Sequence, residues 1–537
     1  MIPLINGFKK ELPGRLVFPT DTFTCSGYTE MLMVLQERLN QLPRYTALFC
    51  MEDREDPFVE INVRPGMPAG AYLLNIYTNG VQVNVSYEEG IANALTTLYW
   101  LIRKNDGNVP CCELSDSPQK PYRGILLDCS RHFFDVATVK SMIEQCALRK
   151  LNRVHWHLSD DQGYRIESKR FPELNMISSW RIEMDGIRYG GYYSMQEIRN
   201  IVHYAAVRGI EIVPEVGIPG HVTALIAAHP EHSCSGEPAD VVSSVGIHNR
   251  ILCAGKDEAV VFIKELYDEI CPLFPYEYFH IGGDEAPKAE WEKCPHCRSR
   301  IKKEGLSGTE ELQAWFMQQL QKHLESHGKK VICWNESLKS GKLNEDAVVQ
   351  YWYEETGTYA EGAFNPGRKY IYSESKELYF DYSPAMTPLR TVLKSIPHFA
   401  DGTPMQEDDI LGYEACLWAE QIYDRTRLEQ MAFPRIFGLA QRGWCADVDY
   451  TAFNESCIKE TAYLLEDGIA HHGVKESDLS GQAQLEAIVA DWKPKVQLVR
   501  MVGQEMYIPM VCNAVKHRLI GIFTSEEIDW VLHEIVS

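Results

Sequence analysis

The sequence predicts an α/β protein: a (β/α)8 TIM barrel, preceded by a small α+β domain and followed by a C-terminal helical extension. Three observations predict this fold. A hairpin pattern lies near the N-terminus, eight short apolar segments alternate with amphipathic helices, and the end of the chain is helical in pattern. The predicted domains are residues 1–118, 119–460 and 461–537. With 537 residues, 45% of them hydrophobic, the chain can bury a core of this size.

The N-terminal domain is predicted from a β-hairpin followed by a helix. Apolar and polar residues alternate on both sides of Asn79-Gly80, a dipeptide that is typical of a tight hairpin turn. The apolar members are Tyr72, Leu74 and Ile76 before the turn and Val81, Val83 and Val85 after it. Apolar residues then recur at helical spacing from Ile91 to Ile102. Residues 105–121 are expected to be a linker.

The barrel is predicted from eight strand-like segments separated by crossovers. These are residues 124–129, 154–158, 210–216, 278–282, 330–334, 348–352, 370–373 and 411–418. Amphipathic helices are expected between several of them, around Val139–Cys146, Met195–Ala205 and Leu312–Leu324. A doubly wound open sheet is the alternative, but the phosphate-binding fingerprints GxGxxG and GxxxxGK[ST] are missing from the sequence.

The C-terminal extension is predicted to be helical. Leu485, Ile488, Trp492 and Val496 share one helical face, and a second helix is expected over residues 526–536. These helices are expected to pack on the barrel or to build a homodimer interface.

The composition excludes several partners. A formal net charge of -22 disfavours nucleic acid and anionic membrane surfaces. The sequence has no run of 18 apolar residues, and its first residues lack the apolar core of a signal peptide, so a cytoplasmic location is expected.

The 16 cysteines are scattered and several lie in apolar segments, which favours a reducing compartment over a disulfide framework.

One cysteine pair has the spacing of half a metal site. Cys294 and Cys297 form a CxxC motif, but no second CxxC completes four ligands. A surface turn with two thiols is therefore expected in preference to a zinc or redox site.

Unusual polar and aromatic residues gather where the predicted strands end. In a barrel the carboxyl ends of the strands form one face, and that face carries the site. Taken strand by strand, the residues are Arg123, which begins the first strand; His155, His157, Asp160 and Asp161; Glu215 and His221; Asp284 and Glu285; Trp334, Asn335 and Glu336; Trp352; Tyr379 and Asp381; and Trp418 and Glu420.

Each of these residues alone has a structural interpretation. A tryptophan can pack at a rim, a histidine can be a hydrogen-bonded core residue, and paired acids can cap a turn. Together they predict a polar pocket with aromatic walls. Sugars suit such a pocket, because their C–H faces pack on indoles while charged side chains bind the hydroxyls.

Five ordered motifs resemble a known family. They are YRGILLDCSRHF (122–133), KLNRVHWHLSDDQGYRIE (150–167), PEVGIPGH (214–221), HIGGDEAPKAEW (280–291) and LWAE (417–420). They are similar to glycoside hydrolase family 20, the β-N-acetylhexosaminidases, and the likeness covers roughly residues 60–445.

The resemblance implies an exo-acting, retaining hydrolase without a cofactor or a metal. Its substrate would be an oligosaccharide or glycoconjugate with a terminal β-linked GlcNAc or GalNAc. The 2-acetamido oxygen of the sugar would attack the anomeric carbon, so no protein nucleophile is needed. By resemblance, Glu285 is the general acid and Asp284 holds the acetamide N–H. Asp284 is expected to stay ionised and to raise the pKa of Glu285.

The resemblance also assigns supporting roles. It implies that Arg123 binds O3 and O4 of the sugar and that Glu420 binds O4 and O6. Tyr379 would bind the acetamide carbonyl, and Asp381 a hydroxyl. Trp334, Trp352 and Trp418 would wall the sugar, and Asp160 and His221 would support Glu285. Three departures from the family pattern concern the leaving-group side: Gly217 in place of an acid, no tryptophan in residues 383–410, and Gln441 in place of glutamate.

Two other classes of function compete with a hydrolase. A sugar-binding protein on the same barrel would bind without turnover, although adjacent like charges give a pure binder no advantage. A metal-dependent barrel enzyme would use His155, His157, Asp160 and Glu215, because alternating histidines on a strand share one face.

Overall fold

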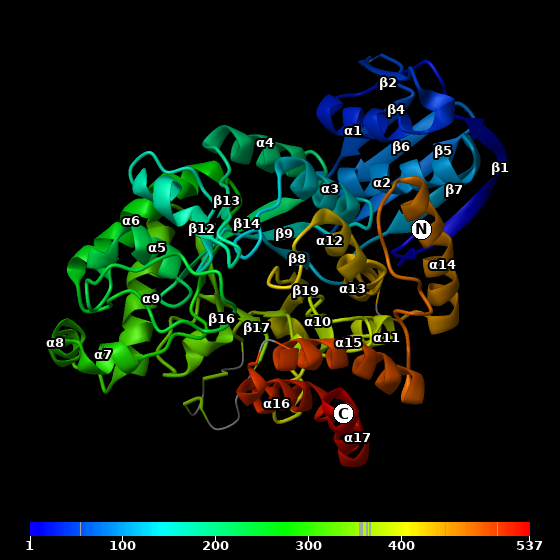
Figure 1. Cartoon of the computed structure of the whole chain (residues 1–537). Coiled ribbons are helices and arrows are strands. Elements are labelled where there is room, and N and C mark those ends of the chain that lie inside the picture. The colour runs from blue at the N-terminus through cyan, green and yellow to red at the C-terminus, as the bar shows by residue number, and fades with distance from the viewer. Residues whose placement is uncertain (54, 354–357, 361–362, 365–366, 446, 502) are drawn as a thin grey trace.

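The computed structural model describes residues 1–537 except positions 54, 354–357, 361–362, 365–366, 446 and 502. Its centre is a closed, all-parallel barrel of eight strands in the order β14-β15-β16-β17-β18-β19-β8-β9 (Figure 1). The strands are β8 (Tyr122–Asp128), β9 (Arg153–His157), β14 (Glu211–Ile218), β15 (Tyr278–Gly282), β16 (Lys330–Trp334), β17 (Val348–Tyr351), β18 (Tyr370–Tyr372) and β19 (Ile410–Leu417). The predicted fold class is confirmed.

Helices surround the barrel, as the periodic segments predict. They are α3 (Val136–Ala147), α4 (Met195–Ala206), α5 (Thr223–Ala228), α6 (Asp257–Ile270), α7 (Ala289–Lys293), α8 (Pro295–Glu304), α9 (Thr309–Ser326), α10 (Ser375–Leu378), α11 (Leu389–Lys394), α12 (Arg425–Ala432) and α13 (Arg435–Trp444). Helix α4 starts with a capping box between Ser194 and Glu197, which satisfies its first backbone N–H groups. All eight predicted strand segments are present, because strands covered on both faces are continuous apolar runs in the sequence.

Four short strands lie in the loops that follow β9. They are β10 (Ser159–Asp160), β11 (Gly163–Tyr164), β12 (Trp180–Ile182) and β13 (Arg188–Gly190). The pair β10–β11 holds Asp160 at the carboxyl face of the barrel.

The N-terminal domain is a seven-stranded sheet covered by helices. The strand order is β1-β7-β5-β6-β4-β2-β3. Its strands are β1 (Lys9–Val17), β2 (Thr22–Cys25), β3 (Phe49–Glu52), β4 (Val59–Val63), β5 (Tyr72–Tyr77), β6 (Gly80–Val85) and β7 (Asn108–Asp116), and its helices are α1 (Thr29–Leu39) and α2 (Glu88–Lys104). The predicted hairpin is the antiparallel pair β5–β6.

The predicted linker at residues 105–121 is wrong over most of its length. Strand β7 occupies residues 108–116 and pairs with both β1 and β5. Val109, Cys112 and Leu114 are buried in the core of the N-terminal domain. The segment resembles a linker in sequence around Cys111-Cys112 and Asp116-Ser117-Pro118, but pairing with strands on both sides makes residues 108–116 a strand.

The N-terminal domain is bonded tightly to the barrel. Lys150 Nζ lies 2.9 Å from Asp116 Oδ2, and both side chains are fully buried. Helix α14 (Tyr450–Glu466) also packs against this domain: Arg103 binds Glu466 and Asp467 at the end of the helix. The boundary predicted at residue 460 therefore falls inside a helix.

The C-terminal residues form a three-helix unit with its own apolar core. The helices are α15 (Gly481–Met501), α16 (Ile508–Leu519) and α17 (Ser525–Val536), and they pack against Ala385 and Met386 of the barrel (Figure 1). Several apolar side chains of α15 and α16 are exposed, among them Leu498, Met501 and Met510. A homodimer interface on these helices stays a prediction.

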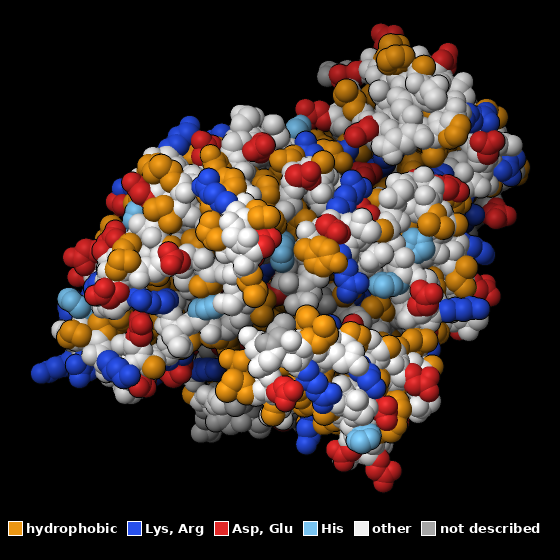
Figure 2. All heavy atoms as spheres, viewed as in Figure 1, with side chains coloured by type: hydrophobic (Ala, Val, Ile, Leu, Met, Phe, Trp, Pro, Cys, Tyr) orange, Lys and Arg blue, Asp and Glu red, His pale blue; other side chains and the backbone are white. Residues whose placement is uncertain are grey.

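The surface mixes charges of both signs. On the face shown in Figure 2, Lys and Arg side chains lie scattered among Asp and Glu side chains. Among the described residues, no helix has both the length and the apolar composition that a membrane crossing requires.

Candidate active site

The acid pair Asp284-Glu285 lies in a tight loop directly after β15. Gly282 and Gly283 have φ values of 70° and 102°, and Glu285 follows in the left-handed region at 41°. A Cβ on Gly283 would lie 1.9 Å from Ser337 Oγ, and a Cβ on Gly282 would lie 2.7 Å from the Cα of Gly217. Only glycine fits at these two positions. The loop frees both acids from strand alternation, and Glu285 has the backbone strain that is common at functional sites.

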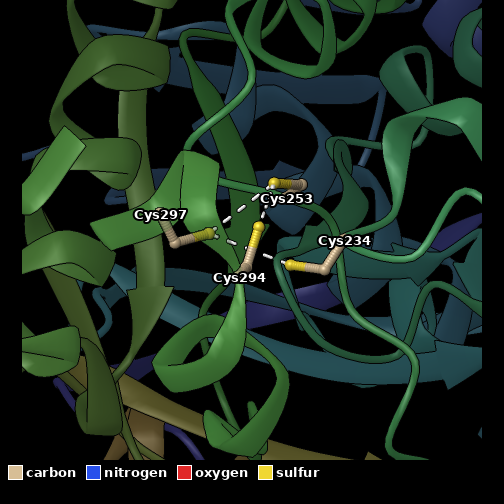
Figure 3. A group of neighbouring side chains, drawn as sticks. All are labelled: Cys234, Cys253, Cys294 and Cys297. Atoms are coloured by element: carbon tan, nitrogen blue, oxygen red, sulfur yellow. Dashed lines mark hydrogen bonds between the residues drawn. The ribbon is translucent and has the colours of Figure 1, made fainter. Parts of the chain in front are cut away.

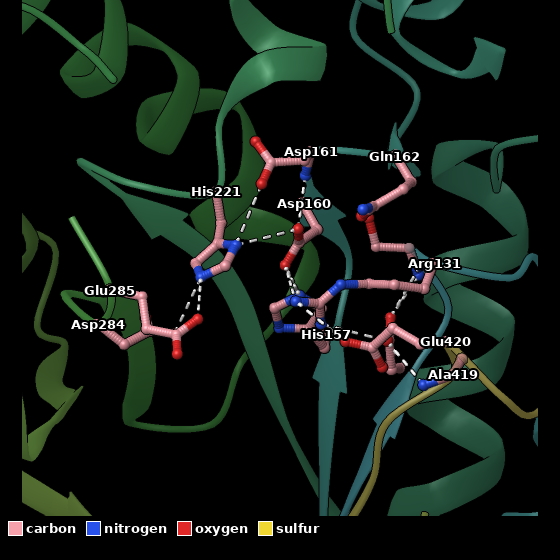
Figure 4. A network of polar contacts seen from close by, with 12 residues as sticks. Arg131, His157, Asp160, Asp161, Gln162, His221, Asp284, Glu285, Ala419 and Glu420 are labelled. Atoms are coloured by element: carbon pink, nitrogen blue, oxygen red, sulfur yellow. Dashed lines mark hydrogen bonds and ion pairs between the residues drawn. The ribbon is translucent and has the colours of Figure 1, made fainter. Parts of the chain in front are cut away.

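His221 connects this pair to a second acid pair. Its Nε2 lies 3.5 Å from Asp284 Oδ2 and 3.3 Å from Glu285 Oε2 (Figure 4). Its Nδ1 lies 3.3 Å from Asp160 Oδ1 and 3.2 Å from Asp161 Oδ2. Burial lowers the pKa of His221, but Asp160, Asp161 and Glu285 raise it well above its ordinary value. A charged imidazolium thus lies between the two acid pairs. Both Asp284 and Glu285 face it.

Behind this layer, hydrogen bonds occupy the polar side chains of β9 and β14. His157 donates to Glu215 and lies 3.0 Å from Asp160 Oδ2 through its Nε2. His155 Nδ1 lies 2.8 Å from Glu414 Oε1. Burial lowers the pKa of His157, but Glu215 and Asp160 raise it to about 10. The four residues of the metal-dependent alternative therefore all bind protein partners inside the barrel, and His157 positions Asp160 through its Nε2.

Arg131 is the arginine at the site. It follows the carboxyl end of β8, where its Nη2 lies 2.8 Å from Asp160 Oδ2 and 3.8 Å from Glu420 Oε1. Its Nη1 lies 3.2 Å from Asp128 Oδ2, and its guanidinium lies over the Trp418 ring at 4.9 Å. Its Nε is buried without a hydrogen-bond partner among the described residues.

The prediction that Arg123 binds the sugar is wrong. Arg123 lies at the amino end of β8, on the opposite side of the barrel from the acid pair. Its guanidinium donates to Glu89 at 2.7 Å and to the carbonyls of Lys120 and Lys150 at 2.8 and 3.0 Å. Arg123 is buried and joins the barrel to the N-terminal domain.

The remaining predicted polar residues lie on the same rim as Arg131. Tyr379 and Asp381 run beside β19, where Phe380 N donates to Cys416 O at 2.8 Å. Asp381 Oδ1 is buried without a hydrogen-bond partner among the described residues. Burial raises the pKa of Asp381 to about 7; Glu420 adds to this shift and Arg518 opposes it.

Arg518 of α16 also reaches this rim and was not expected there. Its guanidinium lies 3.4 Å from the Tyr382 ring centroid and 5.6 Å from that of Tyr379. Its Nη1 donates to Ser375 O at 2.7 Å. The C-terminal helices thus contribute a positive charge to the rim, through a contact that spans more than a hundred residues of sequence.

The predicted tryptophans gather around Tyr379. Trp352 stacks on the Tyr379 ring at 5.9 Å and 11°, and Trp334 lies 5.7 Å from Trp418. Trp334 is almost fully buried and donates to Glu215 Oε1 at 3.0 Å, so it forms the floor of the aromatic group. Trp352 and Trp418 are partly exposed and form its walls.

Glu336 extends the acid cluster toward the outside of the site. It accepts from Trp352 Nε1 at 3.2 Å and from Glu285 N at 3.4 Å. Burial and the nearby Asp284 raise the pKa of Glu336 to about 8, and Lys339 opposes this shift. A hollow of about 360 Å³ lies beside Glu285, and Glu336, Lys339, Ile247 and Asn249 are among its lining residues.

The surroundings of Asp284 set the pH range in which its expected ionised form exists. Burial, Glu215 and Glu285 raise the pKa of Asp284 to about 6, although His221 lowers it. Its side chain is 21% exposed, so some solvent still reaches it. The ionised form that the predicted role requires therefore predominates only above about pH 6.

The structure locates the departures at Gly217 and Gln441. Gly217 of β14 faces Gly282 of β15, and a Cβ on Gly217 would lie 3.6 Å from the Cα of Gly282, an ordinary contact. Gln441 is buried in α13, where its Oε1 accepts from Leu4 N at 2.7 Å. It connects the N-terminus to the barrel and lies outside the candidate site.

Paired acids beside a wall of indoles, at the carboxyl face of a parallel barrel, define the class of barrel enzymes that act on sugars. Residues 121–447 match the family model "Glycosyl hydrolase family 20, catalytic domain", and the chain belongs to that family.

Individual proteins agree with this assignment. A β-hexosaminidase of Porphyromonas gingivalis is 37% identical over 68% of this chain, which corresponds to 48% of that relative, so the match spans about half of the relative's length. The crystal structure of a β-N-acetylhexosaminidase from Bacteroides fragilis has a TM-score of 0.79 and 27% identity, covering 90% of this chain and 99% of that one. An exo β-N-acetylglucosaminidase from Vibrio harveyi, solved with N-acetylglucosamine, has a TM-score of 0.75 and 27% identity, covering 88% and 78%.

Proposed function

We propose that this chain is an exo-acting, retaining β-N-acetylhexosaminidase that uses substrate-assisted catalysis. The observation that carries the proposal is the acid pair: Asp284 and Glu285 both face His221, so they lie on the same side of the site. A conventional retaining glycosidase places its acid and its nucleophile on opposite sides of the scissile bond. An acid pair on one side suits a reaction in which the substrate supplies the nucleophile.

In the proposed reaction, Glu285 gives its proton to the glycosidic oxygen as the bond to the anomeric carbon breaks. The acetamide oxygen attacks that carbon from the opposite face and forms an oxazolinium ion. Asp284 accepts the acetamide N–H and offsets the positive charge. Glu285 then takes a proton from a water molecule as the oxygen of that water attacks the anomeric carbon. The new bond displaces the acetamide oxygen, opens the oxazolinium ring and restores the original anomeric configuration.

The surrounding side chains suit a terminal N-acetylhexosamine. Trp334, Trp352 and Trp418 supply apolar surface for the acetamide and the sugar face, and Tyr379 supplies a hydroxyl for the acetamide carbonyl. The guanidinium of Arg131 and the carboxyl groups of Asp381 and Glu420 lie on the same rim and suit sugar hydroxyls. Arg131 takes the role that the resemblance implied for Arg123.

A panel of aryl glycosides and natural disaccharides, followed by proton NMR, tests the proposal. A β-configured N-acetylhexosamine is expected as the first product, before mutarotation. The same panel identifies the preferred epimer at O4 and the preferred linkage. An α-configured first product would show inversion and overturn the mechanism.

The two arginines give different predictions for kcat/KM, although the loss of either one leaves buried carboxylates unpaired and is expected to destabilise the fold. Arg131→Ala is expected to lower kcat/KM by about 10- to 150-fold, because a charged hydrogen bond to a substrate contributes about 1.5–3 kcal/mol. Arg123→Ala leaves Glu89 without its ion-pair partner, with Asn152 still donating to Glu89 Oε1, and is expected to destabilise the fold by about 3–5 kcal/mol. Its folded fraction is expected to keep the wild-type kcat/KM. Kinetics and urea unfolding of both variants check this, and a kinetic defect in folded Arg123→Ala would reverse the assignment.

The acidic limb of the pH profile is expected to follow Asp284. The profile of kcat/KM reports groups of the free enzyme, so activity is expected to fall below about pH 6 as Asp284 takes up a proton. Asp284 faces the charge of His221 on one side and the carboxylates of Glu215, Glu285 and Glu336 on the others. Because His221 lowers the pKa of Asp284, His221→Gln is expected to move the limb to higher pH.

The control for this experiment is His203→Gln, on the exposed side of α4, which is expected to leave the profile unchanged. Thermal melting checks that both variants fold. A limb that stays in place, or that moves to lower pH, in His221→Gln would contradict the assignment to Asp284.

A further inference from the structure

Four cysteines from two distant segments meet beside the active-site loop. Cys234 and Cys253 lie at the two ends of the loop formed by residues 235–252, and Cys294 and Cys297 lie at the start of α8. All four Sγ atoms lie within 4.8 Å of one another, and Figure 3 shows the thiols pointing toward a common centre. Cys253, Cys294 and Cys297 are buried and Cys234 is half-buried, so the predicted surface turn with two thiols is wrong.

The sulfur positions have the dimensions of a tetrahedral metal site. The Sγ atom of Cys297 lies 3.8 Å from that of Cys234 and 3.6 Å from that of Cys253, which is 3.7 Å from the Cys294 Sγ. Zinc–sulfur bonds of about 2.3 Å in a tetrahedron place the sulfurs about 3.8 Å apart. A disulfide would require a separation of about 2.05 Å. The cluster therefore has the spacing of four ligands around one ion.

The backbone holds the cluster in place independently of its thiols. Ser233 pairs with Leu252 at the base of the loop, and Trp291 Nε1 donates to Leu252 O at 2.8 Å. A Cβ on Gly255 would lie 2.2 Å from Cys297 N, so the two segments touch backbone to backbone. The N–H of Gly255 donates to the Cys253 sulfur, as is suited to a thiolate.

We propose that Cys234, Cys253, Cys294 and Cys297 bind one zinc ion with a structural role. Four sulfur ligands at tetrahedral spacing favour zinc among the common cellular metals, and four protein ligands close the coordination sphere. Such a site leaves no position for a substrate and so does no chemistry of its own. It stabilises the fold around it.

The position of the site indicates what it stabilises. The loop formed by residues 235–252 contributes Ile247 and Asn249 to the hollow beside Glu285. In the same loop, Ser244 O accepts a hydrogen bond of 2.8 Å from Nε2 of Gln162, the residue that follows Asp161. The other two ligands lie on the segment that continues from Glu285 through α7. One ion would thus join the outer wall of the hollow to the segment that carries the catalytic acid.

Metal analysis of the full-length protein tests the proposal without using activity. Protein purified under reducing conditions, without chelator and from zinc-supplemented medium, is expected to contain about one zinc per chain by plasma mass spectrometry. Cys234→Ser and Cys297→Ser are expected to lose this zinc. The control is Cys512→Ser. Cys512 is half-buried like Cys234 but lies on α16, outside the cluster, so this variant is expected to keep its zinc.

A second measurement uses the unmutated protein, so its result does not depend on whether the cysteine variants fold. Stripping the metal with a strong chelator is expected to lower Tm and to speed amide hydrogen exchange in residues 235–252. Zinc, and not magnesium, is expected to reverse both effects. Protein that takes up no zinc under reducing conditions, that holds iron in its place, or whose four cysteines form disulfides would overturn the proposal.

Discussion

Glu285→Gln is expected to lower kcat on β-N-acetylhexosaminides by about 10²- to 10⁴-fold, the usual contribution of a positioned general acid. The glutamine keeps the shape of the side chain but has no acidic proton for the leaving oxygen. The loss is therefore expected to grow with the basicity of the leaving group. It should be small for an activated aryl glycoside and large for a natural disaccharide. Steady-state rates on a series of aryl leaving groups measure this slope.

Asp284→Asn is expected to behave differently on the same series. It removes the charge that offsets the forming oxazolinium ion, which costs about 10²- to 10³-fold in kcat by analogy with other transition-state donors and acceptors. This loss should be nearly the same for every leaving group, since Asp284 acts on the acetamide. The matched control is Glu292→Gln, on the exposed face of α7, which is expected to keep full activity. Near-normal turnover of a natural disaccharide in either active-site variant would refute its role.

The second large effect concerns the substrate. An aryl β-glucoside has a hydroxyl where the N-acetylhexosaminide has its acetamide, and it is expected to be cleaved with kcat/KM lower by about 10⁵-fold, the lower range of effective molarity for a well-placed intramolecular group. Both substrates carry the same leaving group, so the comparison isolates the acetamide. Equal rates on the two sugars would exclude catalysis by the substrate's own group.

Binding must be separated from chemistry in this comparison. The parent sugars, N-acetylglucosamine and glucose, serve as competitive inhibitors and report how much of the difference is affinity. Tyr379 and the tryptophans around it contact the acetamide in the proposed complex. Part of the difference is therefore expected in the binding affinity of the two sugars. The larger part is expected in kcat, because the nucleophile itself is missing.

The barrel could be predicted from the sequence because its strands are short apolar runs between amphipathic helices. Both signals are local: all eight strand segments are present, and helices lie between most of them. Strand β7 could not be predicted in this way. Its residues resemble a loop, and the partners that make it a strand, β1 and β5, lie far away in sequence.

The site could be predicted where a residue follows the carboxyl end of its strand. Asp284, Glu285, Trp418 and Glu420 obey that rule. Arg123 violates it, because it lies at the amino end of β8, whereas Arg131 obeys it. Applied consistently to the first strand, the rule would have selected Arg131.

The cysteine cluster and Arg518 needed the structure. Cys253 and Cys294 are 41 residues apart, and Cys234 and Cys297 are 63 apart, so no local motif unites them. Only the meeting of the loop with α8 brings them together. Arg518 likewise reaches the rim through the packing of three C-terminal helices, and helical periodicity does not predict which side of a barrel a helix will cover.

The central claim is that the attacking atom is the acetamide oxygen of the substrate, and a series of aryl substrates with acetyl, fluoroacetyl, difluoroacetyl and trifluoroacetyl groups on nitrogen tests it most directly. Fluorine withdraws electrons from the carbonyl oxygen, so each step weakens this nucleophile. We predict that kcat/KM falls at every step, by well over about tenfold across the series, which corresponds to more than about 1.4 kcal/mol of lost transition-state stabilisation. Rates that stay level from acetyl to trifluoroacetyl would contradict the account, because they would show that another atom attacks the sugar.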